Sequence, residues 1–103
     1  MDCTIKTTDA FANWFSKLKD KRIKNKILAR LARVENGNFG DYKQIAQHLF
    51  ELRFFFGSGF RVYFTIQNHQ IVLLLEGGDK STQMSDIAKA KQLLNILEQQ
   101  NEN

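Results

Sequence analysis

Two arginines and a glutamate lie close to a short glycine turn, and side chains of these types can bind or cleave a phosphodiester. Arg53 precedes the turn Gly57-Ser58-Gly59, Arg61 follows it, and Glu51 lies two residues before Arg53. If the turn joins two antiparallel strands, these three side chains point to one face of a sheet. Like charges so close together repel each other, so we expect an anion between the two arginines.

That anion is either Glu51 itself or a phosphate group of a ligand. A cross-strand ion pair from Glu51 to Arg53 or Arg61 would be structural and worth under about 1 kcal/mol. A phosphate would instead bind the planar guanidinium group, which can donate two parallel hydrogen bonds. The pattern alone leaves both alternatives open.

A lysine in a second glycine loop is a further basic candidate. Lys80 follows Gly77-Gly78, directly after the apolar run Ile71–Leu75. A loop at the end of a buried strand can carry a charged group over the polar face of the sheet. Most exposed lysines bind nothing specific, so Lys80 alone is weak evidence.

The N-terminal third of the chain carries an excess of positive charge. Residues 1–33 hold nine lysines and arginines against three aspartates, whereas the rest of the chain holds six against eight acidic residues. This excess favours a polyanionic partner, either nucleic acid or an acidic protein segment. Five of the cations recur every three or four residues and form one stripe: Lys19, Arg22, Lys26, Arg30 and Arg33. The stripe either holds a phosphate backbone or is only the solvated face of an amphipathic helix.

The elements that position these residues are predicted from hydrophobic periodicity and from turn residues. We expect a strand over 2–6, a helix with the apolar stripe Phe11–Leu18, a break near Asp20, a second helix with the stripe Ile23–Val34, strands over 49–56, 60–66 and 71–75, and a last helix that opens at Ser85-Asp86. The order β-α-α-β-β-β-α predicts an α+β fold with a small, curved, mostly antiparallel sheet, an N-terminal αα-hairpin and a C-terminal helix. We expect the helices to pack on one face of this sheet.

Length and composition limit the class of protein. The 103 residues fit one domain over 1–103, with a tail over 99–103 that is expected to fray. No apolar run approaches the roughly 20 residues of a membrane span, and the N-terminus does not resemble a secretion signal. We therefore expect a soluble, cytoplasmic protein without a membrane partner. Cys3 is the single cysteine, which excludes an internal disulfide, and we expect neither a metal nor another cofactor.

Several segments of the chain resemble one family of bacterial toxins. They are Phe11–Asp20, Ala29–Arg33, Gly37–Asp41, Glu51-Leu52-Arg53, Gly57–Phe64 and Gly77–Gln83. Together they resemble the HigB-like addiction module killer proteins, within the RelE/ParE superfamily of type II toxin–antitoxin systems. The resemblance extends from about residue 11 to about residue 94.

The resemblance implies a RelE-like fold, a cognate antitoxin that usually carries a helix-turn-helix DNA-binding domain, and growth inhibition through ribosome-dependent cleavage of mRNA. By position, Arg61 is similar to the phosphate-contacting arginine of the superfamily. Arg53 and Lys80 are similar to the other basic members of that site. The chain differs from many ribosome-dependent nucleases of the superfamily in that Ser81–Asp86, after the last strand, contains neither tyrosine nor histidine.

The leading hypothesis is a metal-independent endoribonuclease that acts on mRNA in the ribosomal A site. The ribose 2′-hydroxyl attacks its own 3′-phosphate, Arg61 and Arg53 stabilise the pentacoordinate phosphate, and Lys80 assists charge neutralisation or proton transfer. Glu51 is either a general base or a group that only orients Arg53.

Further residues are predicted to bind RNA. The basic stripe would hold ribosomal RNA, and Tyr63 or Phe55 would stack on an unpaired base. Two alternative functions stay open: a ParE-like inhibitor of DNA gyrase without nuclease activity, and a non-catalytic basic nucleic-acid-binding domain.

Overall fold

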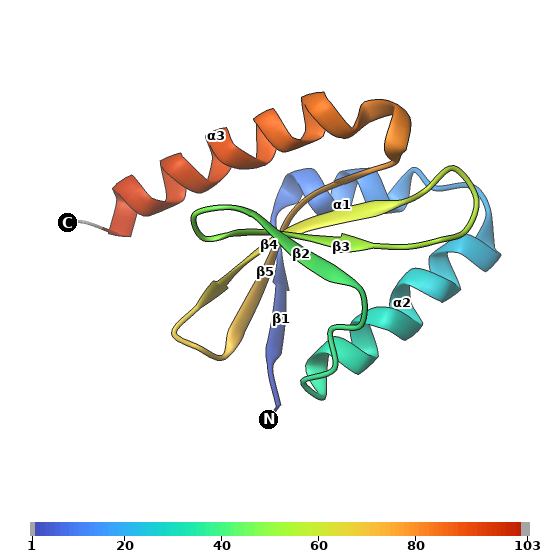
Figure 1. Cartoon of the computed structure of the whole chain (residues 1–103), viewed down its shortest axis with the longest axis horizontal. Helices are drawn as coiled ribbons and strands as arrows, with labels where there is room; N and C mark the ends of the chain where they lie inside the picture. Colours follow the sequence, from blue (N-terminus) through green and yellow to red (C-terminus); the bar gives the residue numbers. More distant parts are fainter. Residues whose placement is uncertain (1, 102–103) are drawn as a thin grey trace.

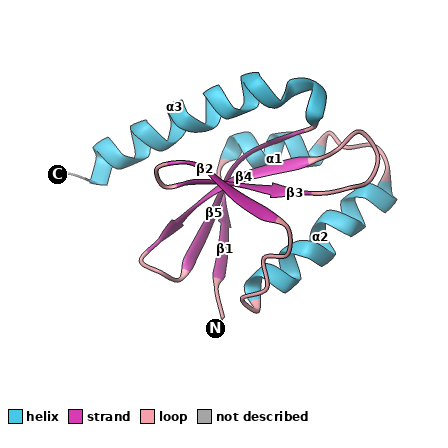
Figure 2. Ribbon diagram, viewed as in Figure 1, coloured by secondary structure: helices cyan, strands magenta, loops and turns pink. Residues whose placement is uncertain are grey.

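Residues 2–101, which this computed structural model describes, form a five-stranded sheet with helices on both of its faces (Figure 1). In chain order the elements are β1 (Thr4–Thr7), α1 (Asp9–Ser16), α2 (Lys21–Glu35), β2 (Tyr42–Ala46), β3 (Leu49–Arg53), β4 (Arg61–Gln67), β5 (Ile71–Gly78), the 3-10 helix η1 (Lys80–Thr82) and α3 (Gln83–Asn101). The α+β class, the two N-terminal helices and the C-terminal helix are confirmed (Figure 2).

The strands lie in the order β1-β5-β4-β3-β2. Only the β1–β5 pair is parallel within the described residues, so the predicted mostly antiparallel sheet is confirmed. The strands β3 and β4 meet in the register Glu51 to Tyr63 and Arg53 to Arg61. This register places the two arginines directly opposite each other at one end of the sheet.

The helix boundaries follow from local capping groups. Thr8 caps α1, because its hydroxyl accepts a hydrogen bond of 3.1 Å from the Phe11 amide. Asp20 caps α2 by accepting a bond of 2.9 Å from the Arg22 amide, which confirms the predicted break between the helices. After α2 the chain turns at Gly37 with φ +88°, a left-handed conformation that favours glycine at a helix end.

The helices cover opposite faces of the sheet, so the expectation that all of them pack on one face is wrong. The helices α1 and α2 pack on one face of the sheet, against residues such as Leu52, Val62 and Phe64. Successive strand residues point to opposite faces, and Tyr63 accordingly packs against Leu94 of α3. Figure 1 shows α3 on one side of the sheet and α2 on the other. The face of the sheet that carries the predicted polar site is therefore partly covered by α3.

One strand and several element boundaries differ from the prediction. The strand β2 was not predicted, because its hairpin to β3 turns at Gln47-His48 without a glycine, with His48 at φ 60°. The strand β3 ends at Arg53, so residues 54–60 form a loop longer than the predicted turn. The last helix begins at Gln83 and continues over residues 99–101, where fraying was predicted. The rest of that predicted tail, 102–103, lies outside the described residues.

No helix among the described residues has the length and apolar character needed to cross a membrane.

Candidate functional site

The side chains of Arg53 and Arg61 meet at one internal carboxylate. Nε of Arg53 lies 3.7 Å from Oε1 of Glu51, and Nε of Arg61 lies 3.8 Å from Oε2. Neither Nε atom has a hydrogen-bond partner within the part of the chain that the structure describes. Glu51 therefore lies close to both arginines and offsets part of their charge, which is the structural alternative of the two predicted for this pair; Oδ2 of Asp41 also lies 4.0 Å from Nε of Arg53.

Glu51 itself is buried, with 3% of its surface exposed. Its Oε2 also accepts a hydrogen bond of 2.8 Å from Nε2 of Gln83, the first residue of α3. A general base must reach the proton that it removes, and this carboxylate is enclosed by the two arginines and by α3. The burial and the ion pairs therefore favour the predicted alternative in which Glu51 only orients Arg53.

Tyr63 lies beneath α3 and does not reach the surface. Its side chain is fully buried against Leu49, Leu75 and Leu94. Burial raises the pKa of Tyr63, and the negative charge of Glu51 raises it further, so the phenol stays neutral. The prediction that Tyr63 stacks on an RNA base is wrong, because α3 covers its ring.

Arg61 and Lys80 line the same open depression, whose volume is about 420 Å³. Both side chains pass close to Gly59, which has φ +77°. A Cβ atom at this position would lie 3.3 Å from Nη1 of Arg61 and 3.4 Å from Cβ of Lys80. Glycine is thus favoured here both by the backbone conformation and by the space that the two cations need. Arg53 is not part of this lining, although it lies opposite Arg61 on the neighbouring strand and shares the Glu51 carboxylate with it.

Hydrogen bonds hold Lys80 beside the turn Gly57-Ser58-Gly59. The Ser58 hydroxyl donates a bond of 2.8 Å to Asp79, and the Lys80 amide donates one of 3.3 Å to the Ser58 carbonyl. Hydrogen bonds from Ser81 and Ser58 hold the pKa of Asp79 below its usual value. Asp79 therefore remains an anion near neutral pH and holds together the two loops that carry Arg61 and Lys80.

Arg30 is an internal residue rather than part of the exposed basic stripe. Its side chain donates hydrogen bonds of 2.9, 2.9 and 2.7 Å to the carbonyls of Phe39, Arg53 and Asp41. Burial lowers the pKa of Arg30, although an arginine remains charged at any ordinary pH. The predicted RNA contact of Arg30 is wrong, because its donors bind the backbone and only 8% of the residue is exposed.

The other members of the predicted stripe are exposed. Lys19 lies in the linker between α1 and α2, and Arg22, Lys26 and Arg33 lie on α2. Lys26 contacts the loop after β3, where its Nζ lies 4.8 Å from the centre of the Phe56 ring. These four cations remain candidates for nucleic-acid contact.

Sequence reasoning missed two residues of the site. Gln83 orients Glu51 across a separation of 32 residues, and nothing in the local pattern indicates that contact. Asp79 could have been found, because an Asp three residues before a Thr can form reciprocal capping bonds, and Asp79 with Thr82 forms this capping box.

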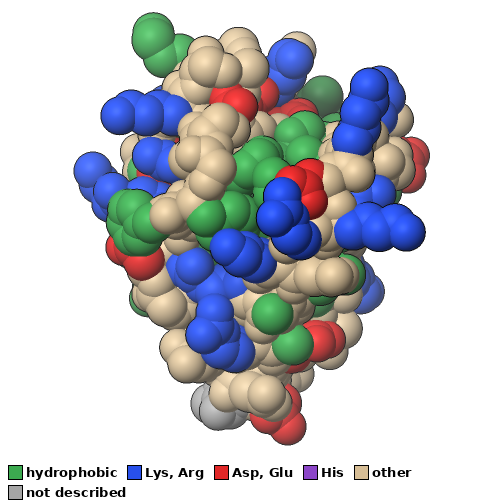
Figure 3. All heavy atoms as spheres, turned by 90° about the vertical axis from the view of Figure 1, so that its right-hand side faces the viewer, with side chains coloured by type: hydrophobic (Ala, Val, Ile, Leu, Met, Phe, Trp, Pro, Cys, Tyr) green, Lys and Arg blue, Asp and Glu red, His purple; other side chains and the backbone are tan. Residues whose placement is uncertain are grey.

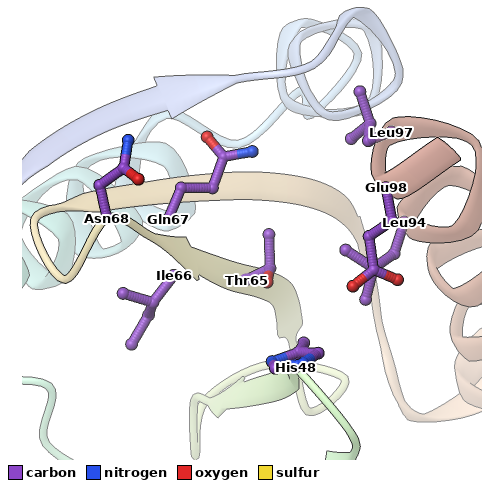
Figure 4. Close-up of a pocket in the computed structure, with 8 residues that line it drawn as sticks. All are labelled: His48, Thr65, Ile66, Gln67, Asn68, Leu94, Leu97 and Glu98. Atoms are coloured by element: carbon purple, nitrogen blue, oxygen red, sulfur yellow. The ribbon is translucent and has the colours of Figure 1, made fainter. Parts of the chain in front are cut away.

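A larger hollow of about 590 Å³ lies away from these residues, between the β2–β3 turn, β4 and the C-terminal half of α3 (Figure 4). Its lining includes His48, Thr65 and Glu98 but no lysine or arginine. The hollow therefore has no lysine or arginine that could attract a phosphate, and it is not part of the candidate site. Within residues 2–101, no cluster of three histidine, cysteine or acidic side chains is arranged to hold a metal ion.

Comparison with known proteins places the chain in a family. Residues 13–95 match the model of the family described as Phage derived protein Gp49-like (DUF891). The chain belongs to this family. The Gp49-like domain is a RelE-like domain of the toxin class. The expected RelE-like character is thus confirmed at the level of the family.

A relative of this Gp49-like chain occurs in Haemophilus influenzae (strain ATCC 51907 / DSM 11121 / KW20 / Rd). The two are 54% identical over 97 residues, which cover 94% of this chain and 98% of the relative. The relative is described as an uncharacterized protein. No solved structure matches the chain.

Proposed function

We propose that this Gp49-like protein is the HigB-like toxin of a toxin–antitoxin pair, and that it is an endoribonuclease that cleaves mRNA on the ribosome. The observation that carries the proposal is the open depression shared by Arg61 and Lys80. The RelE-like family supports the toxin class. The resemblance to HigB-like proteins supports a cognate antitoxin as the partner.

In the proposed reaction the RNA supplies its own nucleophile. The ribose 2′-oxygen bonds to the adjacent phosphorus while the bond from phosphorus to the 5′-oxygen breaks, which leaves a 2′,3′-cyclic phosphate. Water accepts the proton of the 2′-hydroxyl, and the Lys80 ammonium gives a proton to the leaving 5′-oxygen. Arg61 stabilises the charge that develops on the phosphate oxygens.

In the proposal, Arg53 and Glu51 support the action of Arg61 and Lys80. Arg53 is about a third exposed, with its side chain at 32%, so it can contact the same RNA from the other strand. Glu51 holds both guanidinium groups near 4 Å and so fixes their direction before substrate arrives. Such prior orientation of cations is a main source of catalysis at charged transition states.

The test is expression of variants in a bacterium, followed by growth measurement and mapping of transcript ends. Arg61→Ala should abolish growth arrest and transcript cleavage, whereas the exposed α3 variant Lys91→Ala should keep both. Arg61→Lys keeps the charge but not the guanidinium fork, so it should retain only part of the activity. Thermal unfolding of the purified variants checks that each one folds.

Other outcomes would select a different function. A fully toxic Arg61→Ala variant would refute the proposed mechanism. A DNA-damage response without transcript cleavage would favour a gyrase inhibitor. Binding that weakens uniformly and in a salt-dependent manner in Lys26→Ala and Arg33→Ala, with no cleavage by wild type, would favour a non-catalytic nucleic-acid-binding domain.

A further inference from the structure

The loop after β3 exposes the ring of one phenylalanine, and the residues on either side of it are held in place. In this aromatic loop, Phe54–Phe56, the middle residue Phe55 is 81% exposed, whereas Phe54 is 3% exposed. The Arg30 guanidinium lies 5.0 Å from the centre of the Phe54 ring, and the Phe56 ring meets Phe54 edge-on at 5.7 Å. The neighbours of Phe55 are therefore anchored while its own ring faces solvent.

Cations lie on both sides of Phe55. On one side it borders the depression with Arg61 and Lys80, and on the other it borders a depression of about 280 Å³ with Lys26 and Arg33. This face, which carries the aromatic loop at the right of Figure 1, is turned to the viewer in Figure 3. Figure 3 shows hydrophobic side chains gathered there with lysine and arginine side chains around them.

The chemistry of the surface selects one kind of partner. Neither lining, as the structure describes it, contains an aspartate or glutamate, so the charged side chains that face both depressions are cations. An exposed ring between two cationic depressions matches a chain that alternates phosphates with flat bases. A double helix would offer phosphates but keep its bases stacked inside, and an acidic peptide would offer charge without bases.

We propose that single-stranded RNA crosses the aromatic loop, with one unpaired base stacked on Phe55. The phosphate on one side lies at Arg61 and Lys80, and the phosphate on the other side lies at Lys26 and Arg33. This inference deepens the proposed function, on which it rests for the identity of the nucleic acid. It assigns Phe55 as a binding residue that places the scissile phosphate.

The test is fluorescence anisotropy with a single-stranded RNA of about 12 nucleotides, whose 2′-O-methyl riboses prevent cleavage, and with the duplex of the same sequence. Wild type should prefer the single strand. Phe55→Ala should weaken single-strand binding by about tenfold, since stacking on an aromatic side chain contributes about 1–3 kcal/mol. Phe55→Leu should lose as much, and Phe55→Trp should bind as wild type does. Ile96→Ala removes an exposed apolar side chain from α3 and should change nothing.

Several results would overturn the inference. They are the absence of single-strand binding by wild type, unchanged binding in Phe55→Ala, full binding in Phe55→Leu, or displacement of the RNA by poly-glutamate at equal charge. Because the probe cannot be cleaved, this test is independent of the growth assay. Phe55-dependent binding by a wild type that cleaves no transcript would refute the nuclease function alone.

Discussion

Arg53 of β3 lies directly opposite Arg61 of β4, and the two guanidinium groups reach the two oxygens of one buried carboxylate. Like charges in directly opposed positions destabilise a sheet; Glu51 offsets both charges, and Asp41, 4.0 Å from Nε of Arg53, offsets one of them. The Arg61 side chain borders the open depression, is 12% exposed, and donates a hydrogen bond of 2.7 Å from Nη1 to the Gly59 carbonyl.

The first prediction concerns that carboxylate. Glu51→Gln should lower the free energy of unfolding by about 2 kcal/mol, because it removes the carboxylate that lies near both guanidinium groups, while Asp41, 4.0 Å from Nε of Arg53, and the partial exposure of Arg53 offset some of the repulsion. Urea unfolding followed by circular dichroism measures the change. Gln83→Ala is the matched control, since it removes only one hydrogen bond to the carboxylate and should cost about 1 kcal/mol. Equal stability of Glu51→Gln and wild type would show that the arginines do not need this anion.

The second prediction separates two arginines of α2 that have the same spacing pattern but different environments. Arg30→Ala should lower the free energy of unfolding by about 3 kcal/mol, because three carbonyls lose a charged donor in a buried setting. Arg33→Ala should stay within about 0.5 kcal/mol of wild type and instead weaken RNA binding. The comparison needs thermal or urea unfolding and the anisotropy assay on both variants. If Arg33→Ala proves the less stable variant, the assignment of the two roles is wrong.

The different environments of Arg30 and Arg33 show which part of the structure the sequence pattern does not predict. The periodicity of apolar residues predicted α2 well, because Ile27, Leu31 and Val34 must face the sheet. It could not predict that Arg30, next to that stripe, turns inward to bind the loop before β2. That contact exists because Gly40, with φ +68°, brings the loop so close that a Cβ there would lie 2.8 Å from Nε of Arg30. Such a fit depends on tertiary contact rather than on spacing.

The candidate site was predictable to a similar extent. Alternation along β3 and β4 correctly placed Glu51, Arg53, Arg61 and Tyr63 on one face. The burial of each side chain could not be predicted, because the alternation of residues along the strands does not say which part of that face α3 covers. The helix buries Tyr63 and Glu51 and leaves Arg53 and Arg61 nearer the end of the sheet. The position of one helix thus decides which of four polar residues can meet a ligand.

The third prediction follows from the burial of Tyr63. Its hydroxyl makes no well-formed hydrogen bond among the described residues, although the Glu51 carboxylate lies near it, so Tyr63→Phe removes a poorly satisfied polar group and keeps the packed ring. The variant should be as stable as wild type or more stable by up to about 1 kcal/mol, with unchanged RNA binding. Tyr63→Ala, in contrast, should cost about 3–5 kcal/mol because it empties the space beneath α3. Weaker RNA binding in Tyr63→Phe, at unchanged stability, would restore the stacking role that we reject.

The fourth prediction is a pH dependence at Glu76, which lies opposite Tyr63 on β5. Burial raises the pKa of Glu76, and the nearby Asp86 adds to the shift, while a hydrogen bond from the Gly77 amide and the charge of Lys89 oppose it. Because the folded pKa lies above the unfolded one, ionisation favours the unfolded state. The contribution of Glu76 to the free energy of unfolding is therefore fully present below the unfolded pKa of about 4.3, and it is lost as the pH rises through the folded pKa.

Glu76→Gln is neutral at every pH and therefore isolates this effect. The variant should be more stable than wild type at about pH 7, and the difference should vanish below about pH 4. Urea unfolding at a series of pH values measures both curves. Asp79→Asn provides the opposite control, because the pKa of Asp79 is lowered by its hydrogen bonds. That variant should be less stable than wild type near neutral pH and should approach it only in strong acid. A constant gap between wild type and Glu76→Gln across the whole series would mean that desolvation does not control the ionisation of Glu76.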